Sequence, residues 1–202
     1  MKISELLNEA KSSGTTAVVG WGRGMGHKGH MYLASAVIEY AEQIGATPFF
    51  FVSETVGADD PLTPQEKLSI YKTVFPEQSG TFHSAKTIVP ALVSVHEQGF
   101  DNLVFVVGEA EKPSFKFLQG QTKAGHPVLP FKRVQVMSRQ ETGTSTSNLE
   151  GPRATPMRDV LKNPDATAKQ KWAVWRDAMP DALSDDQVKR LMILVAQRLG
   201  AM

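Results

Sequence analysis

Residues 16–30 of the chain read TAVVGWGRGMGHKGH, a short apolar run followed by a glycine-rich segment that ends in two histidines. The run from Thr16 to Val19 is β-branched and apolar and stops at Gly20, which predicts a buried strand. The glycines that follow predict a loop over residues 20–26, whose backbone can approach an anion closely. A helix is expected from His30 to Ile44. A strand, a glycine-rich loop and a helix in this order are typical of phosphate-binding turns in α/β proteins.

The rest of the chain continues the alternation of strands and helices. Strands are expected at 48–52, 103–107 and 133–137, a strand–helix pair over 81–99, and a polar loop at 142–147. A helix from Pro64 to Phe75 has a strong start, because Thr63 is a suitable N-cap, proline suits the first helical position, and Glu66 completes a capping box. This order predicts an α/β fold with a Rossmann-like open parallel sheet and helices on both faces.

The ends of the chain add helices to this sheet. An amphipathic helix is expected over residues 3–12, and another from Asp185 to Leu199. We therefore expect an α/β domain over residues 1–160 and a C-terminal helical extension of the same domain over residues 161–202.

The composition is that of an ordinary globular protein. Of 202 residues, 41% are hydrophobic and 21% charged, and the formal net charge is +1, so no nucleic-acid or membrane surface is predicted. The absence of cysteine excludes disulfides and thiolate sites and fits a reducing compartment. Because no apolar run approaches the roughly 20 residues of a membrane helix, a cytoplasmic location is expected.

The two histidines, His27 and His30, are the candidate chemical groups. At the start of a helix, imidazoles and free backbone N–H groups can donate hydrogen bonds to phosphate oxygens as negative charge builds there. Two other interpretations stay open. Histidines three residues apart can ligate zinc, although no third ligand is obvious. The glycines also loosely match a dinucleotide fingerprint, for which Glu54 is the sole acidic candidate.

The pattern Gly22-Arg23 followed by His27-Lys28-Gly29-His30 resembles the signature of the HxGH nucleotidyltransferase superfamily. This group includes nicotinamide-mononucleotide and phosphopantetheine adenylyltransferases and the small cytidylyltransferases. The resemblance implies transfer of NMP, with AMP expected before CMP, from a nucleoside triphosphate with Mg²⁺ to a phosphorylated small molecule, with release of pyrophosphate. His27 and His30 would be catalytic, and Gly22, Arg23 and Gly24 would bind the nucleotide.

A second family element, Ser/Thr-x-x-Arg at the start of a late helix, is matched by residues 155–158. Thr155 suits the cap position of that helix and Pro156 its first turn. The resemblance implies that Thr155 and Arg158 hold the β- and γ-phosphates, with Lys28 and Arg153 as auxiliary positive charges.

The glycine loop departs from the family pattern, because it is one residue shorter and lacks the usual proline before the histidine. Residues 60–67 also resemble a segment of nucleotidyltransferase-like proteins of large bacteriophages, whose location would be the host cytoplasm. Two functions therefore stay open. The first is nucleotidyl transfer, with nicotinamide mononucleotide as the leading acceptor. The second is a non-catalytic nucleotide-binding protein, regulatory or structural in a phage, on the same fold. A homo-oligomer is compatible with either.

Four acidic residues lie near the expected strand ends: Asp59, Asp60, Glu109 and Glu111. One of them could bind magnesium or substrate. For each, however, a solvated loop charge is the expected role, because charged side chains are almost never fully buried unless paired.

Overall fold

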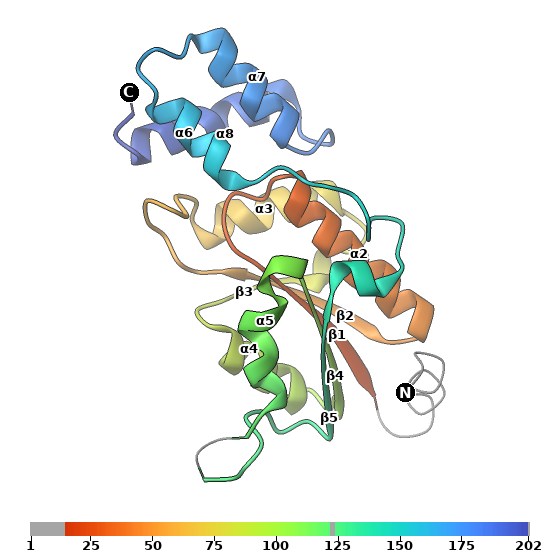
Figure 1. Cartoon of the computed structure of the whole chain (residues 1–202). Coiled ribbons are helices and arrows are strands. Elements are labelled where there is room, and N and C mark those ends of the chain that lie inside the picture. Colours follow the sequence, from red (N-terminus) through yellow and green to blue (C-terminus); the bar gives the residue numbers. More distant parts are fainter. Residues whose placement is uncertain (1–14, 122–123, 202) are drawn as a thin grey trace. The chain divides into compact units, whose positions relative to one another are not determined.

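The computed structural model of the chain describes residues 15–121 and 124–201 (Figure 1). These residues form a parallel α/β sheet of five strands flanked by helices, which confirms the expected Rossmann-like class. The strands are β1 (Thr16–Gly22), β2 (Thr47–Ser53), β3 (Phe82–Ala85), β4 (Asn102–Val107) and β5 (Arg133–Ser138). The helices are α2 (Lys28–Ile44), α3 (Pro64–Val74), α4 (Ile88–Glu97), α5 (Lys112–Phe115), α6 (Ala154–Lys162), α7 (Ala168–Ala178) and α8 (Asp185–Arg198). The helix expected over residues 3–12 lies outside the described residues.

The strand order is β3-β2-β1-β4-β5, so the direction of winding reverses between β1 and β4. These two strands pair in parallel, with Val18 opposite Val104 and Gly20 opposite Val106. In open α/β sheets, ligands bind beyond the carboxyl ends of the strands at such a reversal. The carboxyl end of β1 leads directly into the glycine-rich segment.

The glycine loop predicted for residues 20–26 begins later than expected, because β1 runs on to Gly22. Gly20 lies within the strand, and a Cβ atom there would stand 2.6 Å from Cδ2 of Phe50 and 2.8 Å from Cγ2 of Val37. This glycine therefore allows β1 to pack closely against side chains of β2 and α2, rather than giving flexibility to a loop.

The helix starts follow the sequence signals closely. Thr63 caps α3, its hydroxyl accepting from the Glu66 amide while the Glu66 carboxylate accepts from the Thr63 amide, and Pro64 is the first helical residue. The predicted capping box is thus confirmed. Helix α2 begins two residues earlier than expected, because the His27 carbonyl accepts hydrogen bonds from the amides of His30 and Met31. Gly45, at φ +66°, follows its end.

The described chain divides into two compact units. The first contains β1 as far as Trp21 and residues 33–51 and 85–148; its core is apolar and comes mainly from β1, β2, β4, β5 and α4. The second contains residues 22–32, 52–84 and 149 onward. Within the second unit α6, α7 and α8 pack together, and the buried Trp175 indole donates to the Met157 carbonyl at 2.9 Å. The boundary expected at residue 160 falls within α6.

Among the described helices, none combines the length and the apolar character needed to span a membrane.

Candidate functional site

All of the site residues predicted from the sequence belong to the second compact unit. They are contributed by the end of β1, the start of α2 and the start of α6: Gly22, Arg23, Gly24, His27, Lys28, His30, Arg153, Thr155 and Arg158. Two segments more than a hundred residues apart in the sequence thus contribute to one folded unit.

The two histidines stack on each other at the N-terminus of α2. His27 immediately precedes the helix and His30 is its third residue. Their ring centroids are 4.1 Å apart and the ring planes differ by 19°. The strand–loop–helix order therefore presents both imidazoles beside the free amides of a helix start, as the sequence predicts.

Both imidazoles are neutral near pH 7. His27 is only 6% exposed, and its burial, together with the positive charge of Arg158, lowers its pKa to about 4. Burial also lowers the pKa of His30, and repulsion from His27, when that ring is protonated, and from the Lys67 ammonium lowers it further. A neutral imidazole has one N–H donor. The Nδ1 atoms of both rings are buried and find no hydrogen-bond partner among the described residues.

Two glycines ahead of the histidines adopt left-handed backbone conformations, Gly24 at φ +89° and Gly26 at φ +62°. A Cβ atom on Gly24 would contact Cε1 of His30 at 3.5 Å, and one on Gly26 would press against Ile70 at 3.1 Å. The loop backbone therefore follows a path that only glycine takes without strain. Arg23 precedes Gly24, and its side chain is exposed.

The second predicted motif lies two positions further into its helix than expected. Helix α6 starts at Ala154, a strong helix former, and the extended residue before it, Arg153, occupies the cap position without a side-chain capping bond. The prediction of Thr155 as the cap is therefore wrong: Thr155 is the second residue of α6. Both Arg153 and Thr155 have exposed side chains.

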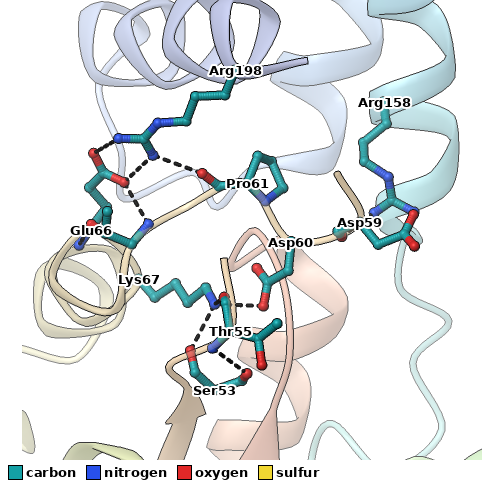
Figure 2. A network of polar contacts seen from close by, with 10 residues as sticks. Ser53, Thr55, Asp59, Asp60, Pro61, Glu66, Lys67, Arg158 and Arg198 are labelled. Atoms are coloured by element: carbon teal, nitrogen blue, oxygen red, sulfur yellow. Dashed lines mark hydrogen bonds and ion pairs between the residues drawn. The ribbon is translucent and has the colours of Figure 1, made fainter. Parts of the chain in front are cut away.

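Arg158 is engaged by Asp59 (Figure 2). Its Nη1 donates to the Asp59 carbonyl at 2.9 Å, its Nη2 is 3.5 Å from Oδ1 of the same residue, and Thr155 Oγ1 lies 3.5 Å from Nη2. The Arg158 side chain is 13% exposed, whereas that of Asp59 is 96% exposed. Because the charge of Arg158 also lowers the pKa of His27, the late motif and the histidine pair interact electrostatically.

The backbones of the two motifs also meet. A Cβ atom on Gly151 would lie 2.3 Å from the Gly29 Cα atom, and a Cβ atom on Gly29 would lie 2.8 Å from the Pro152 carbonyl oxygen. Side chains at either position would force the segments apart. Gly29, between the two histidines, is thus fixed against the segment that leads into α6.

Lys28 forms an ion pair with Asp181, with 3.1 Å between Nζ and Oδ1. The Asp181 side chain is 84% exposed, so the pair is screened by solvent and contributes little to stability. Nothing in this contact prevents Lys28 from exchanging Asp181 for a more highly charged anion.

Asp60 is not a solvated loop charge, in contrast to the expectation from the sequence. It is buried, and its Oδ2 accepts from Nζ of the fully buried Lys67 at 2.6 Å. Lys67 is not identified from the sequence as a buried partner of an acidic residue. The available signal was helical spacing, since Lys67 lies three and four residues before the buried Ile70 and Tyr71, on the inward face of α3.

Within residues 15–121 and 124–201, no group of three or more His, Asp or Glu side chains could hold a metal ion. Glu54 is the acidic residue on which the alternative of a dinucleotide site depends. Its carboxylate accepts a hydrogen bond from the Ser84 hydroxyl at 3.0 Å. A magnesium ion that arrives with phosphates needs few protein ligands, because it keeps several of its waters.

No family model, no curated protein and no solved structure matches the chain.

Proposed function

We propose that the protein is a nucleotidyltransferase that moves an NMP group, AMP in the first instance, from a nucleoside triphosphate to a phosphorylated small molecule and releases pyrophosphate. The observation that carries the proposal is the stacked, neutral pair His27 and His30 at the N-terminus of α2, preceded by left-handed glycines and influenced by the charge of Arg158. The free backbone amides at a helix N-terminus bind phosphate, and histidines at the same place can donate hydrogen bonds to the phosphate oxygens.

In the proposed reaction, an oxygen of the acceptor phosphate attacks the α-phosphorus of the triphosphate. A new P–O bond forms, the bond from the α-phosphorus to the bridging oxygen breaks, and its electron pair leaves with pyrophosphate. The acceptor phosphate is already an anion near neutral pH, so no general base is needed. Magnesium belongs to the triphosphate substrate and neutralises part of its charge.

The histidines stabilise the charge that builds on the phosphate oxygens. Each neutral imidazole donates one N–H hydrogen bond, and the α2 amides add further donors. The approach of a triphosphate favours protonation of the rings, in opposition to the burial that lowers their pKa values in the free protein. Binding of the nucleotide is therefore expected to take up protons from solution.

Arg158 and Thr155 bind the leaving pyrophosphate, with Arg158 exchanging the Asp59 carboxylate for phosphate oxygens and keeping its hydrogen bond to the Asp59 carbonyl. Gly22 and Gly24 give the triphosphate access to the loop backbone, and Arg23 adds charge beside it. Lys28 and Arg153 are auxiliary charges at the rim. The leading acceptor is nicotinamide mononucleotide.

The test is pyrophosphate release with magnesium. Each of ATP, CTP, GTP and UTP is paired with nicotinamide mononucleotide, phosphopantetheine, and simple sugar or alcohol phosphates. Release that requires both a triphosphate and one acceptor, and that disappears in His27→Ala and His30→Ala, supports the proposal. Tight ATP binding with no release from any pair would favour the rival function, nucleotide binding without turnover, to which the short glycine loop also points.

A further inference from the structure

Lys67 is a fully buried lysine whose three N–H donors are all used. Its Nζ donates to the Ser53 carbonyl at 2.7 Å, to the Thr55 carbonyl at 2.8 Å and to Oδ2 of Asp60 at 2.6 Å, with the side chain 0% exposed (Figure 2). The ammonium group thus joins the end of β2 to a residue that lies just before α3.

A buried ion pair is weak evidence of a purely stabilising role. Removing two charges from water carries a large desolvation penalty, and well-packed apolar side chains of similar volume often do as well or better. The Lys67–Asp60 pair is therefore expected to have a role other than stabilisation. One such role is to hold the segment between its two partners in a single conformation.

The segment joined by Lys67, residues 53–60, ends in a tight turn over residues 57–60. The amide of Gly57 donates to the Asp60 carbonyl at 2.9 Å, and the amide of Asp60 donates back to the Gly57 carbonyl at 3.1 Å. Lys67 bonds to the loop where it starts, at Ser53 and Thr55, and where it ends, at Asp60. We call residues 53–60 the clamped loop.

A second cation secures the residue that follows the clamped loop. Nη1 of Arg198, from α8, donates to the Pro61 carbonyl at 2.8 Å and is held by the Glu66 carboxylate at 2.6 Å. Glu66 is itself the third residue of the α3 capping box. The chain on both sides of Asp60 is thus fixed to helices of the same unit.

The clamped loop in turn orients Arg158, because the guanidinium donates a hydrogen bond of 2.9 Å to the Asp59 carbonyl. We propose that Lys67 is a positioning residue for Arg158. By fixing the clamped loop, Lys67 holds the Asp59 carbonyl in place, and this carbonyl orients the Arg158 guanidinium toward the triphosphate. The inference rests on the proposed function for the role of Arg158. Lys67 itself touches no substrate in this account.

A neutral pair of substitutions tests the inference without leaving a lone buried charge. In Lys67→Met/Asp60→Asn both charges are removed and side-chain volume is kept. We expect the dissociation constant for a non-hydrolysable ATP analogue to rise about tenfold, the scale of one charged hydrogen bond. Arg158→Gln should have a similar effect, and the triple variant should be no worse than Arg158→Gln alone.

The matched control is Lys132→Met/Asp101→Asn, which removes an ion pair of 3.1 Å in the first unit and should leave the affinity unchanged. Additive effects of the Lys67 pair and Arg158 would overturn the inference, as would an unchanged affinity in the Lys67 pair variant. If that variant fails to fold, Lys67→Gln/Asp60→Asn serves, since it also removes both charges but keeps a side-chain N–H donor for the loop carbonyls.

A second readout needs no nucleotide. The Arg158 Nε–H resonance in ¹H–¹⁵N spectra of the free protein, identified with Arg158→Lys, should shift and broaden in the Lys67 variant and stay in place in the Lys132 control. An unmoved resonance contradicts the positioning role. If the wild-type protein binds no nucleotide but this resonance responds, the proposed function fails while the positioning of Arg158 by Lys67 stands.

Discussion

The imidazole ring of His30 stacks on that of His27, with the ring centroids 4.1 Å apart. At this distance, protonation of one ring opposes protonation of the other, and burial opposes both. The pair is therefore uncharged in the free protein and responds strongly to an incoming anion. Most of the predictions below follow from this pair or from the segments that hold it.

Substitution of either histidine should impair catalysis more than binding. In His30→Ala, kcat for nucleotidyl transfer is expected to fall on the order of 10²–10³-fold, as when one preorganised donor to a transition state is removed. The ATP dissociation constant should change by less than about threefold. His83→Ala, at an exposed histidine of the same unit, is the control and should keep full kcat. An equal loss of affinity and turnover would mean that His30 only binds.

The free energy of unfolding should decrease as the pH is lowered, over a range set in part by the pKa of His27. Its pKa is about 4 in the folded protein and about 6.5 in the unfolded chain, so above pH 6.5 the residue is neutral in both states. Below pH 6.5, His27 binds a proton in the unfolded chain but stays neutral in the folded protein until the pH approaches 4. His27 alone should then decrease the free energy of unfolding by up to about 3 kcal/mol between pH 6.5 and 4. His30 and His83, whose pKa values are also lowered, should add to this decrease.

Urea unfolding of the wild type and of His27→Gln across this range measures the effect. The difference between the two slopes isolates His27 from His30 and His83, whose lowered pKa values act in the same range. It also isolates His27 from three glutamates whose lowered pKa values act mainly below pH 4.5, Glu39, Glu66 and Glu141. Parallel pH profiles of the two proteins would refute the assignment.

The contact between Gly29 and Gly151 should tolerate no side chain. Gly151→Ala would bring a methyl group to within 2.3 Å of a backbone atom, and the resulting overpacking should cost about 1–3 kcal/mol of unfolding free energy. Gly80→Ala, with no atom within 4 Å of the added methyl group, should cost far less. Thermal or urea unfolding compares the two. Equal stabilities would show that the two segments do not meet in solution.

Removal of the Asp59 carboxylate should strengthen nucleotide binding. In Asp59→Asn the backbone carbonyl that bonds Arg158 remains, while the negative charge that competes with phosphate is lost. Because the carboxylate is exposed, the gain should not exceed about fivefold, and it should shrink in high salt. Calorimetric titration with ATP at two salt concentrations checks this, with Asp165→Asn as an exposed control. Weaker binding of ATP by Asp59→Asn would contradict the competition.

Much of the fold follows from local signals in the sequence. The strand that ends in glycines and the capping box at Thr63 are short-range patterns, and the structure has both. The prediction of a loop at Gly20 is wrong, because the need for glycine there comes from the close packing of Phe50 and Val37, thirty and seventeen residues away. Propensity read along the chain does not contain such packing constraints.

The candidate site was predictable in its residues but not in its contacts. The sequence indicates His27, His30 and Arg158 separately, whereas the pairing of Arg158 with Asp59 joins segments about a hundred residues apart. Asp60 is expected in solvent from the sequence for a different reason. Its partner, Lys67, is only seven residues away, but a lysine on the inward face of a helix is recognised only when the helical spacing of the buried residues is considered. Charges that pair across a turn lack a linear signature.

The most direct test of the central claim follows the phosphorus atoms of ATP. The protein is incubated with magnesium, the acceptor identified by pyrophosphate release, and ATP labelled either at the α- or at the γ-phosphorus. Nucleotidyl transfer predicts that the α-label appears in the acceptor product and the γ-label in pyrophosphate, with both lost in His27→Ala and His30→Ala. A γ-label on the acceptor, or an α-label transferred equally well by the His27 and His30 variants, would contradict it.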